Sequence, residues 1–320
     1  MDLFEGRLAV ITGGGTGMGR ELARQLSGQG CHVALCDVSA EAMAETRTLC
    51  LADAPRGTDV SVFVADVSDE AQVLAFAEFV SDEHGSDHIN LLFNNAGISG
   101  GGSFIGDDRV VWDKVFAVCW GGVYNCTRAF LPMLMESSEG HIVNTSSING
   151  FWASLGTQSA HTAYSTAKFA VKGFSEALIN DFRLNAPHIK VSVVMPGHIG
   201  TSIALNSASL LGAGPNGLSD EEIETERPRM ARLGIPVEGQ SVSEVRATLK
   251  QFGEMFRDLA PVSAADAATV ILEGVRRGDW RILVGEDAQV LDELVREAPE
   301  NAYEEPFMDR LRARTTWFMP

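Results

Sequence analysis

Two side chains four positions apart are suited to acid–base chemistry. The segment AYSTAK places Tyr164 and Lys168 within a helical pattern over residues 160–185, so both lie on one helix face. A phenol with a pKa of about 10 is a poor base at neutral pH. A nearby ammonium or cationic ring stabilises the phenolate and lowers that pKa. The pair can therefore exchange a proton with an alcohol or ketone, although Tyr-x-x-x-Lys alone is often a chance surface pattern.

A glycine-rich turn near the start of the chain is suited to binding a pyrophosphate. TGGGTGMG covers residues 12–19, after a strand pattern and before a helical one, with Gly13, Gly17 and Gly19 in G-x-x-x-G-x-G spacing. Glycines allow a tight turn and close approach, and free N–H groups at a helix start favour phosphate charge. A purely structural turn is the alternative, but this context favours a nucleotide site.

An acidic residue follows the second strand pattern. Asp37 ends HVALCD, where a carboxylate can accept hydrogen bonds from the adenosine ribose and repel a 2′-phosphate. This position favours NAD over NADP as the cofactor. Two observations leave alternatives open: Arg20 is a cation that could meet a phosphate, and Asp37 could be an ordinary exposed residue.

Strand and helix patterns alternate along the chain. Strands are predicted at RLAVIT, HVALCD, VSVFVAD, INLLFNN, HIVNTSS, KVSVVM and WRILVG. Helical patterns cover residues 17–29, 40–52, 70–84, 108–135 and 160–185. This alternation predicts an α/β fold: a single-domain, Rossmann-type, doubly wound parallel sheet of about seven strands flanked by helices.

Residues 202–261 interrupt that alternation with glycines, prolines and the polar run SDEEIETERPRMAR. An insertion after the carboxyl end of a strand commonly forms a ligand lid, and a surface decoration is the alternative. We therefore expect a dinucleotide-binding core with the catalytic residues (1–201), a substrate-binding lid (202–261), and the last core helix and strand with a tail (262–320). The tail is either a docking arm, which could cover a neighbour's pocket, or a frayed end.

Composition limits the class of protein. The net charge of −18 opposes binding to nucleic acid and anionic membranes. The longest apolar runs are strand-sized, and MDLFEGR does not resemble a secretory signal. The five cysteines form no C-x-x-C pair, so neither a disulfide framework nor a metal site is expected. We expect a cytoplasmic protein.

Five motifs in order resemble the short-chain dehydrogenases/reductases: TGGGTGMG, NNAG, NTSS, YSTAK and PGHIGT. The resemblance covers about residues 4–201, and more loosely extends to residue 285. It implies a Rossmann fold and NAD(P)-linked interconversion of alcohols and ketones without a metal. It also implies a homodimer or homotetramer formed through the helices over residues 108–135 and 160–185.

The resemblance implies catalytic roles. Tyr164 is the general acid/base, Lys168 holds the nicotinamide ribose and lowers the tyrosine pKa, and Ser147 orients the substrate oxygen. Ser147 precedes Tyr164 by seventeen positions, about four more than the family norm, so the intervening loop must bulge outward. Ser146, adjacent in sequence, makes Ser147 an alignment judgement, and Ser154 and Ser159 are weaker candidates.

The resemblance also implies cofactor contacts. Asp66 and Val67 would meet the adenine, and Asn94 would lie on the adenosine side. Ile199 and Thr201 would meet the nicotinamide carboxamide. The full set of expected cofactor-binding residues is Gly13, Thr16, Gly17, Met18, Gly19, Asp37, Asp66, Val67, Asn94, Ala96, Gly97, Tyr164, Lys168, Pro196, Gly197, Ile199 and Thr201.

Four bulky side chains near these motifs have open roles. Phe151 and Trp152 either line an apolar substrate pocket or pack the loop down. His161 and His198 could touch substrate, but loop histidines are more often solvated, so neither is included among the catalytic residues.

One motif departs from the family. AVCWGG stands where VNxxG is expected, so Gly122 matches the family glycine and Cys119 replaces an Asn that ties the lysine, through a water, to a proton relay. Asn125 lies almost two turns too far along. Cys119 is an inert small side chain, a weak S–H donor, or a redox-sensitive thiol near Lys168. A weaker relay predicts slower proton exchange without loss of hydride transfer.

The function best supported by these residues is NAD-linked oxidoreduction of a secondary alcohol or ketone, with a bulky apolar substrate. One alternative keeps the fold and uses bound cofactor for epimerisation or dehydration. The other is a non-catalytic nucleotide-binding scaffold, which retention of Ser147, Tyr164 and Lys168 argues against.

Overall fold

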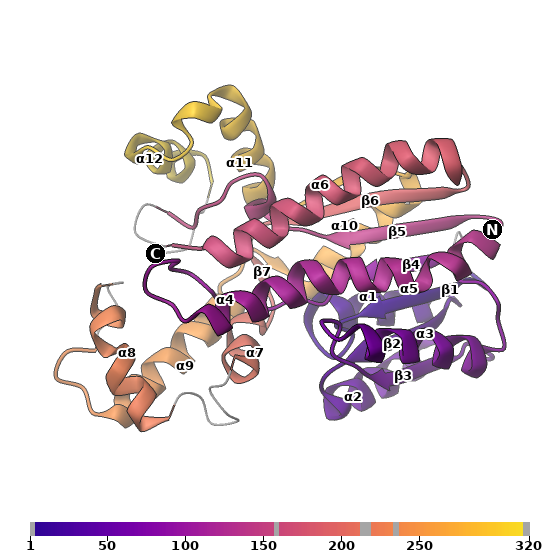
Figure 1. The fold of residues 1–320 in the computed structure, drawn as a ribbon, viewed down its shortest axis with the longest axis horizontal. Helices are drawn as coiled ribbons and strands as arrows, with labels where there is room; N and C mark the ends of the chain where they lie inside the picture. Colours follow the sequence, from indigo (N-terminus) through magenta and orange to yellow (C-terminus); the bar gives the residue numbers. More distant parts are fainter. Residues whose placement is uncertain (1–3, 157–159, 212–218, 233–236, 316–320) are drawn as a thin grey trace.

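The core of the molecule is a seven-stranded, all-parallel sheet (Figure 1). The computed structural model describes residues 4–156, 160–211, 219–232 and 237–315. All seven predicted strands are present and parallel, as a doubly wound fold requires. Their order across the sheet is β3 (Val60–Val64), β2 (His32–Asp37), β1 (Leu8–Thr12), β4 (Leu91–Asn94), β5 (Gly140–Thr145), β6 (Ile189–Pro196) and β9 (Arg281–Val284).

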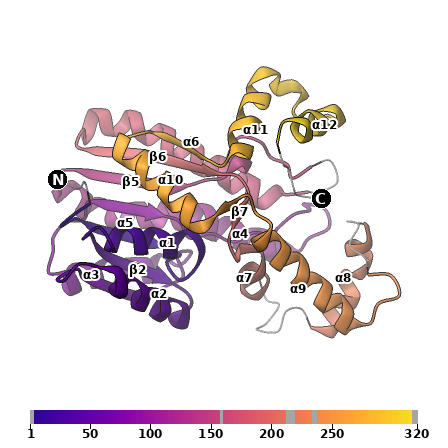
Figure 2. The same ribbon diagram turned by 180° about the vertical axis from the view of Figure 1, so that it is seen from behind.

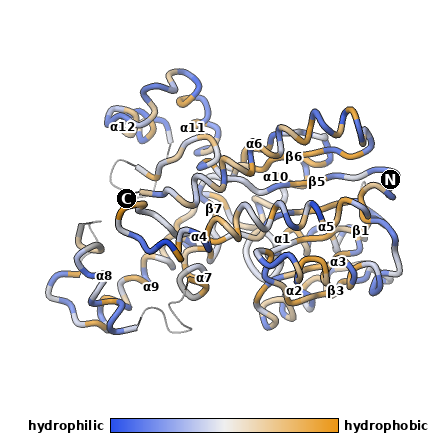
Figure 3. The backbone as a smooth tube through the Cα atoms, viewed as in Figure 1, coloured by the Kyte–Doolittle hydropathy of each residue, from blue (hydrophilic) through white to orange (hydrophobic). Residues whose placement is uncertain are grey.

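Helices cover both faces of this sheet. One face carries α1 (Gly17–Ser27) and α10 (Ala264–Arg277), with α2 (Ala40–Asp53) beside α1. The other carries α3 (Glu70–His84), α5 (Gly122–Glu136) and α6 (Thr162–Asn185). Alternate residues of β1 enter the two layers, because Ala9 packs under α1 while Val10 packs under the opposite helices. The apolar strands in the middle of Figure 3 are thus buried on both sides, and the expected α/β fold is confirmed.

The helical pattern over residues 108–135 is interrupted at its centre. It comprises α4 (Arg109–Phe116), a π-helical turn over Ala117–Gly121, and α5. Cys119 lies within the π-helical turn, a feature often found at functional sites. Gly122 follows it, where a Cβ would lie 2.5 Å from Val67 Cγ2, so only glycine fits.

Two groups of helices extend beyond the carboxyl end of the sheet, on opposite sides (Figures 1 and 2). One consists of α7 (Ile203–Leu210), α8 (Asp220–Arg232) and α9 (Val242–Asp258), the part of the chain expected to form a lid. The short strands β7 (Ile199–Gly200) and β8 (Val262–Ser263) pair where the chain enters and leaves it.

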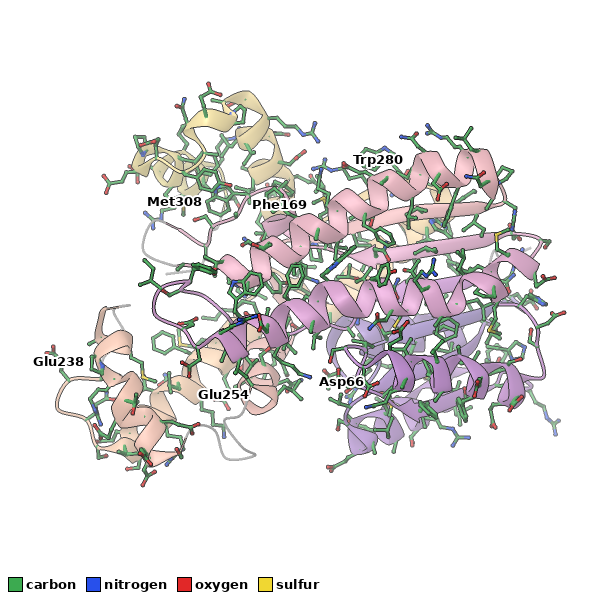
Figure 4. All side chains as sticks on the ribbon, viewed as in Figure 1. Asp66, Phe169, Glu238, Glu254, Trp280 and Met308 are labelled. Atoms are coloured by element: carbon green, nitrogen blue, oxygen red, sulfur yellow. The ribbon has the colours of Figure 1, made fainter. Side chains whose placement is uncertain are left out.

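The second group packs against the loop that carries Ser147. It contains α11 (Glu286–Glu297), the 3₁₀ turn Pro299–Asn301, and α12 (Glu305–Arg314). Trp152 is 1% exposed, packs with Phe307 and Met308, and donates from Nε1 to the Ala302 carbonyl at 2.7 Å (Met308 is labelled in Figure 4). Trp152 therefore packs the loop down, and α12 docks on its own chain; the end of the tail, 316–320, is outside the described residues.

No helix in the described parts of the chain is long and apolar enough to cross a membrane. All five cysteines are free thiols in buried positions.

Candidate active site

A cavity of about 150 Å³ lies at the carboxyl ends of β4, β5 and β6. Ile203 of α7 and Phe256 of α9 border it, so the inserted helices contribute to its wall. A larger hollow around Trp280 contains none of the expected site residues. The expected site residues that line the 150 Å³ cavity are Met18, Gly97, Ser147, Tyr164, Lys168, Pro196, Gly197, Ile199 and Thr201.

Tyr164 and Ser147 both border this cavity, and the Ser147 hydroxyl is close enough to affect the titration of the phenol. Burial, followed by the nearby Cys119, raises the pKa of Tyr164 above its ordinary value, and the Ser147 hydroxyl opposes this rise. The Lys168 ammonium lies 5.4 Å from the centre of the Tyr164 ring and donates to the Thr145 carbonyl at 2.8 Å. Burial lowers the pKa of Lys168. The three side chains thus converge, although burial alone does not make the phenol a better base.

The serine hydroxyls near Tyr164 have different partners. Ser146 Oγ donates to the Lys168 carbonyl at 2.7 Å, so it is engaged by the start of α6. Ser147 Oγ accepts from the Asn149 amide at 3.1 Å and retains contact with Tyr164. Ser154 Oγ donates to the Gly156 carbonyl, and Ser159 is outside the described residues. The geometry therefore favours Ser147 despite the longer loop.

Cys119 is fully buried beside the lysine. Its Sγ donates to the Ile98 carbonyl at 3.2 Å and accepts from the Ile98 amide at 3.4 Å. A Cβ on Gly97 would lie 3.6 Å from Lys168 Nζ and 3.7 Å from Cys119 Sγ, so both groups border the same spot. Burial raises the pKa of the Cys119 thiol and Lys168 opposes this rise. A neutral, enclosed thiol argues against the redox-sensitive interpretation.

The glycine turn has the backbone that a dinucleotide cradle needs. Gly13 and Gly17 have φ of 66° and 54°, in the left-handed region that favours glycine. A Cβ on Gly19 would lie 2.1 Å from the Gly13 carbonyl oxygen. Asp37 accepts from the Gly15 amide at 3.0 Å, which brings its carboxylate to the same turn. These residues fit a bound NAD(P).

Arg20, the cation beside this turn, is occupied. Its guanidinium donates to Glu45 at 2.6 Å and to the Gly15 carbonyl at 2.7 Å. It therefore braces the glycine turn against α2 with its charge paired.

The residues expected near the adenine and adenosine are engaged within the protein. The Asp66 carboxylate binds Lys114 at 2.6 Å, and this bond with those from Ser68 lowers its pKa against the opposing effect of burial. Asn94 is 2% exposed and donates to side chains of α5 and β5, away from the cavity. Its neighbour Asn95 lines the cavity instead, and its buried Oδ1 has no partner among the described residues. Sequence reasoning missed Asn95, although it belongs to the quoted NNAG motif.

The expectation that His198 is solvated is wrong. His198 is 4% exposed, its Nε2 pairs with the Phe256 carbonyl at 2.6 Å, and its backbone amide donates to Asp287 at 2.6 Å. Asp287 is buried and presses against Gly197, where a Cβ would lie 2.2 Å from Oδ1. Burial raises the pKa of Asp287. Asp287, which the sequence did not indicate, thus fixes the loop that is expected to contact nicotinamide.

His161 is also buried, so its expected solvation is wrong too. It is 8% exposed, lines the cavity and stacks on Tyr164 with ring centres 4.7 Å apart and an angle of 23° between the planes. Burial lowers its pKa to about 4, so the imidazole is neutral at physiological pH.

The fold and this site define a nucleotide-dependent oxidoreductase, and comparison with known proteins identifies its family. The family model described as short chain dehydrogenase matches residues 7–209. The putative oxidoreductase SadH of Mycobacterium tuberculosis is 36% identical over 92% of both chains. Levodione reductase of Leifsonia aquatica is 32% identical over 77% of this chain and 92% of its own. A crystal structure of a short-chain dehydrogenase/reductase from Burkholderia phymatum in complex with NAD is 30% identical, covers 94% of this chain and 96% of its own, and superposes with a TM-score of 0.72.

The chain therefore belongs to the short-chain dehydrogenase/reductase family. It is an NAD(P)-dependent dehydrogenase/reductase that acts on CH–OH groups.

Proposed function

We propose that this enzyme interconverts a secondary alcohol and its ketone, with NAD as cofactor and Tyr164 as the general acid/base. The observation that carries the proposal is the convergence of Ser147, Tyr164 and Lys168 on one cavity, where the Ser147 hydroxyl is close enough to lower the pKa of the phenol. This arrangement offers a substrate oxygen two hydroxyl partners, and one of them can exchange a proton.

Each side chain has a separate task. Ser147 donates to the substrate oxygen and orients it, while Tyr164 removes the hydroxyl proton during oxidation and returns it during reduction. Lys168, fixed through Thr145, lies beside the phenol and holds the ribose. Bound NAD supplies the hydride acceptor and the positive charge that lowers the tyrosine pKa.

The substrate has an apolar body. Leu155, Ile203 and Phe256 border the cavity on the side formed by the loop and the inserted helices. Phe151 and Trp152 do not line it, so the apolar preference rests on these three side chains. This wall supports the proposed role of residues 202–261 as a substrate-binding lid.

NAD is preferred over NADP because of the charges beside the glycine turn. Asp37 presents a carboxylate there, and the Arg20 charge is already paired with Glu45. A 2′-phosphate would meet a negative charge with no cation available from Arg20. Family membership alone does not choose between the two cofactors, so the ratio of kcat/KM for NAD and NADP tests this point. An Asp37→Ser variant should shift the ratio toward NADP by about tenfold or more, the equivalent of about 1.4 kcal/mol.

Cys119 stands in place of the family Asn as an inert side chain. The Cys119 thiol bonds to both the carbonyl and the amide of Ile98, in the segment after β4, and so holds the π-helical turn against that segment. A water or a backbone group completes the proton relay.

The enzyme assembles as a homodimer or homotetramer through α5 and α6. Tyr124 of α5 and Phe169 of α6 are 43% and 41% exposed, which fits a face covered by another copy (Phe169 is labelled in Figure 4).

The direct test is a screen of NAD and NADP reduction over a diverse panel of apolar secondary alcohols. NADH should form in step with ketone. Turnover of substrate without any net change in NADH would favour epimerisation or dehydration. Tight NAD binding with no turnover of any substrate would favour a nucleotide-binding scaffold.

A further inference from the structure

The strongest unassigned feature is the His161 imidazole. His161 is the N-cap residue of α6, and its side chain makes no capping hydrogen bond. Tyr164 and Lys168 follow at positions i+3 and i+7, so the three side chains form one stripe along the helix. Lys168 lies on the side expected to hold the cofactor ribose. His161 is therefore beyond Tyr164, at the end of the stripe away from that ribose.

Both ring nitrogens of His161 are buried and have no hydrogen-bond partner within the described part of the chain. Buried polar groups are normally paired, because leaving water without a new partner is costly. Burial also keeps the imidazole neutral, with a pKa lowered to about 4. A neutral imidazole offers one N–H donor and one nitrogen acceptor, a combination that matches a hydroxyl group.

The stacking geometry restricts where a ligand could satisfy this group. The imidazole lies nearly parallel to the phenol with ring centres 4.7 Å apart, and both rings border the same cavity. A substrate whose reacting oxygen contacts Tyr164 therefore presents only its nearest atoms to His161. A distant polar group would instead meet the apolar wall at Leu155 and Phe256.

We propose that His161 binds a second oxygen of the substrate, on the carbon adjacent to the reacting carbon. The substrates are then vicinally oxygenated: diols in the direction of oxidation, and hydroxyketones or diketones in the direction of reduction. This inference rests on the proposed function. During oxidation the reacting carbon loses a hydride to NAD and its hydroxyl loses a proton to Tyr164, while the second oxygen stays unchanged and hydrogen-bonded to His161.

The test compares matched substrates in the purified enzyme with NAD: cyclohexane-1,2-diol against cyclohexanol, and 2-hydroxycyclohexanone against cyclohexanone in reverse. The wild type should favour the dioxygenated member of each pair, the diol or the hydroxyketone, by at least about tenfold in kcat/KM. His161→Leu should lower kcat/KM for the dioxygenated partner by at least about tenfold more than for the mono-oxygenated partner, so that the preference is lost. His161→Gln, which keeps a donor and an acceptor, should restore part of it.

The controls separate this inference from its alternatives. His88→Leu, at a histidine whose side chain is 45% exposed, should leave the preference intact. Equal loss on both partners in His161→Leu, with unchanged NAD binding, would show that the ring only supports Tyr164 and would overturn the inference. If His161→Leu does not fold, absence of the wild-type preference overturns it equally well. Activity on mono-alcohols without that preference leaves the proposed function intact, whereas no NADH from any substrate refutes both.

Discussion

The stripe of His161, Tyr164 and Lys168 on α6 has two ends, and they differ in whether their polar groups find hydrogen-bond partners within the protein. After Tyr164, the Lys168 ammonium donates to the Thr145 carbonyl, and the backbone carbonyl of Lys168 accepts from the Ser146 hydroxyl. Before Tyr164, the His161 ring is also buried but has no hydrogen-bond partner among the described residues. One end is preorganised by the chain itself, and the other leaves hydrogen-bonding capacity for a ligand.

A second buried histidine shows that this difference is not a general property of the fold. His141 of β5 is 6% exposed, and burial lowers its pKa to about 4, as for His161. However, His141 Nε2 pairs with Ser192 Oγ at 2.7 Å. Since Ser192 Oγ donates to the Asp279 carbonyl at 2.6 Å, it accepts from His141, which fixes the tautomer. The unpaired histidine occurs at the cavity and the paired one in the core.

The largest expected effect comes from removing the hydroxyl between the two ends. Tyr164→Phe keeps the ring that stacks on His161 but removes the acid/base, so kcat should fall by about 10²–10⁴-fold. NAD affinity, measured by fluorescence titration, should change little. Tyr124→Phe, on the outer face of α5, is the matched control and should retain full activity. Retained turnover in Tyr164→Phe would show that Tyr164 is not the acid/base, and the comparison between the His161 and Lys168 ends would then have no catalytic meaning.

The next largest effect is expected from weakening the packing between the Ser147 loop and α12. Trp152→Ala empties a fully buried site between the Ser147 loop and α12, at a cost of about 3–5 kcal/mol in the free energy of unfolding. Denaturant unfolding measures that loss. Because the glycine turn is remote from this packing, kcat should fall more than NAD affinity. An equal loss of kcat and NAD affinity would mean that the Ser147 loop and the glycine turn are not supported independently.

The paired histidine should determine part of the acid stability. The folded protein keeps His141 neutral to a pH of about 4, whereas the unfolded chain takes up a proton at about 6.5. The stabilisation is therefore complete above pH 6.5 and is lost as the pH falls toward 4, with a slope of about 1.4 kcal/mol per pH unit. His141→Gln cannot titrate, so this component of the slope should disappear from urea unfolding between pH 7 and 4. An unchanged slope would contradict the assigned burial effect.

The smallest effect is expected at the lysine end. A carboxamide can accept from the Ile98 amide and donate to its carbonyl, as the thiol does, so Cys119→Asn should leave kcat unchanged or raise it. Cys119→Ala is the control, because it leaves both Ile98 groups unpaired and should cost about 1–3 kcal/mol of stability. A collapse of turnover in Cys119→Asn with unchanged NAD binding would show that the thiol itself is needed.

The sequence predicted the parts of this molecule that follow from local patterns. All seven strands, and helices such as Glu70–His84, follow from periodicity and turn residues. The π-helical turn does not follow from a local pattern, and Cys119 within it bonds to Ile98, which is distant in sequence. Local patterns likewise could not reveal the burial of His161 or the partner that Asp287 finds in the His198 amide, since both depend on segments brought together only by the fold.

The central claim is hydride transfer between a substrate carbon and NAD with proton transfer through Tyr164. Its most direct test uses a secondary alcohol that the panel identifies, labelled with deuterium on the carbinol carbon. In the wild type, deuterium should appear in NADH in the same amount as the ketone formed, and Tyr164→Phe should slow this transfer by about 10²–10⁴-fold without loss of NAD binding. Product that forms with deuterium retained on carbon or lost to solvent, or undiminished transfer in Tyr164→Phe, would contradict the account.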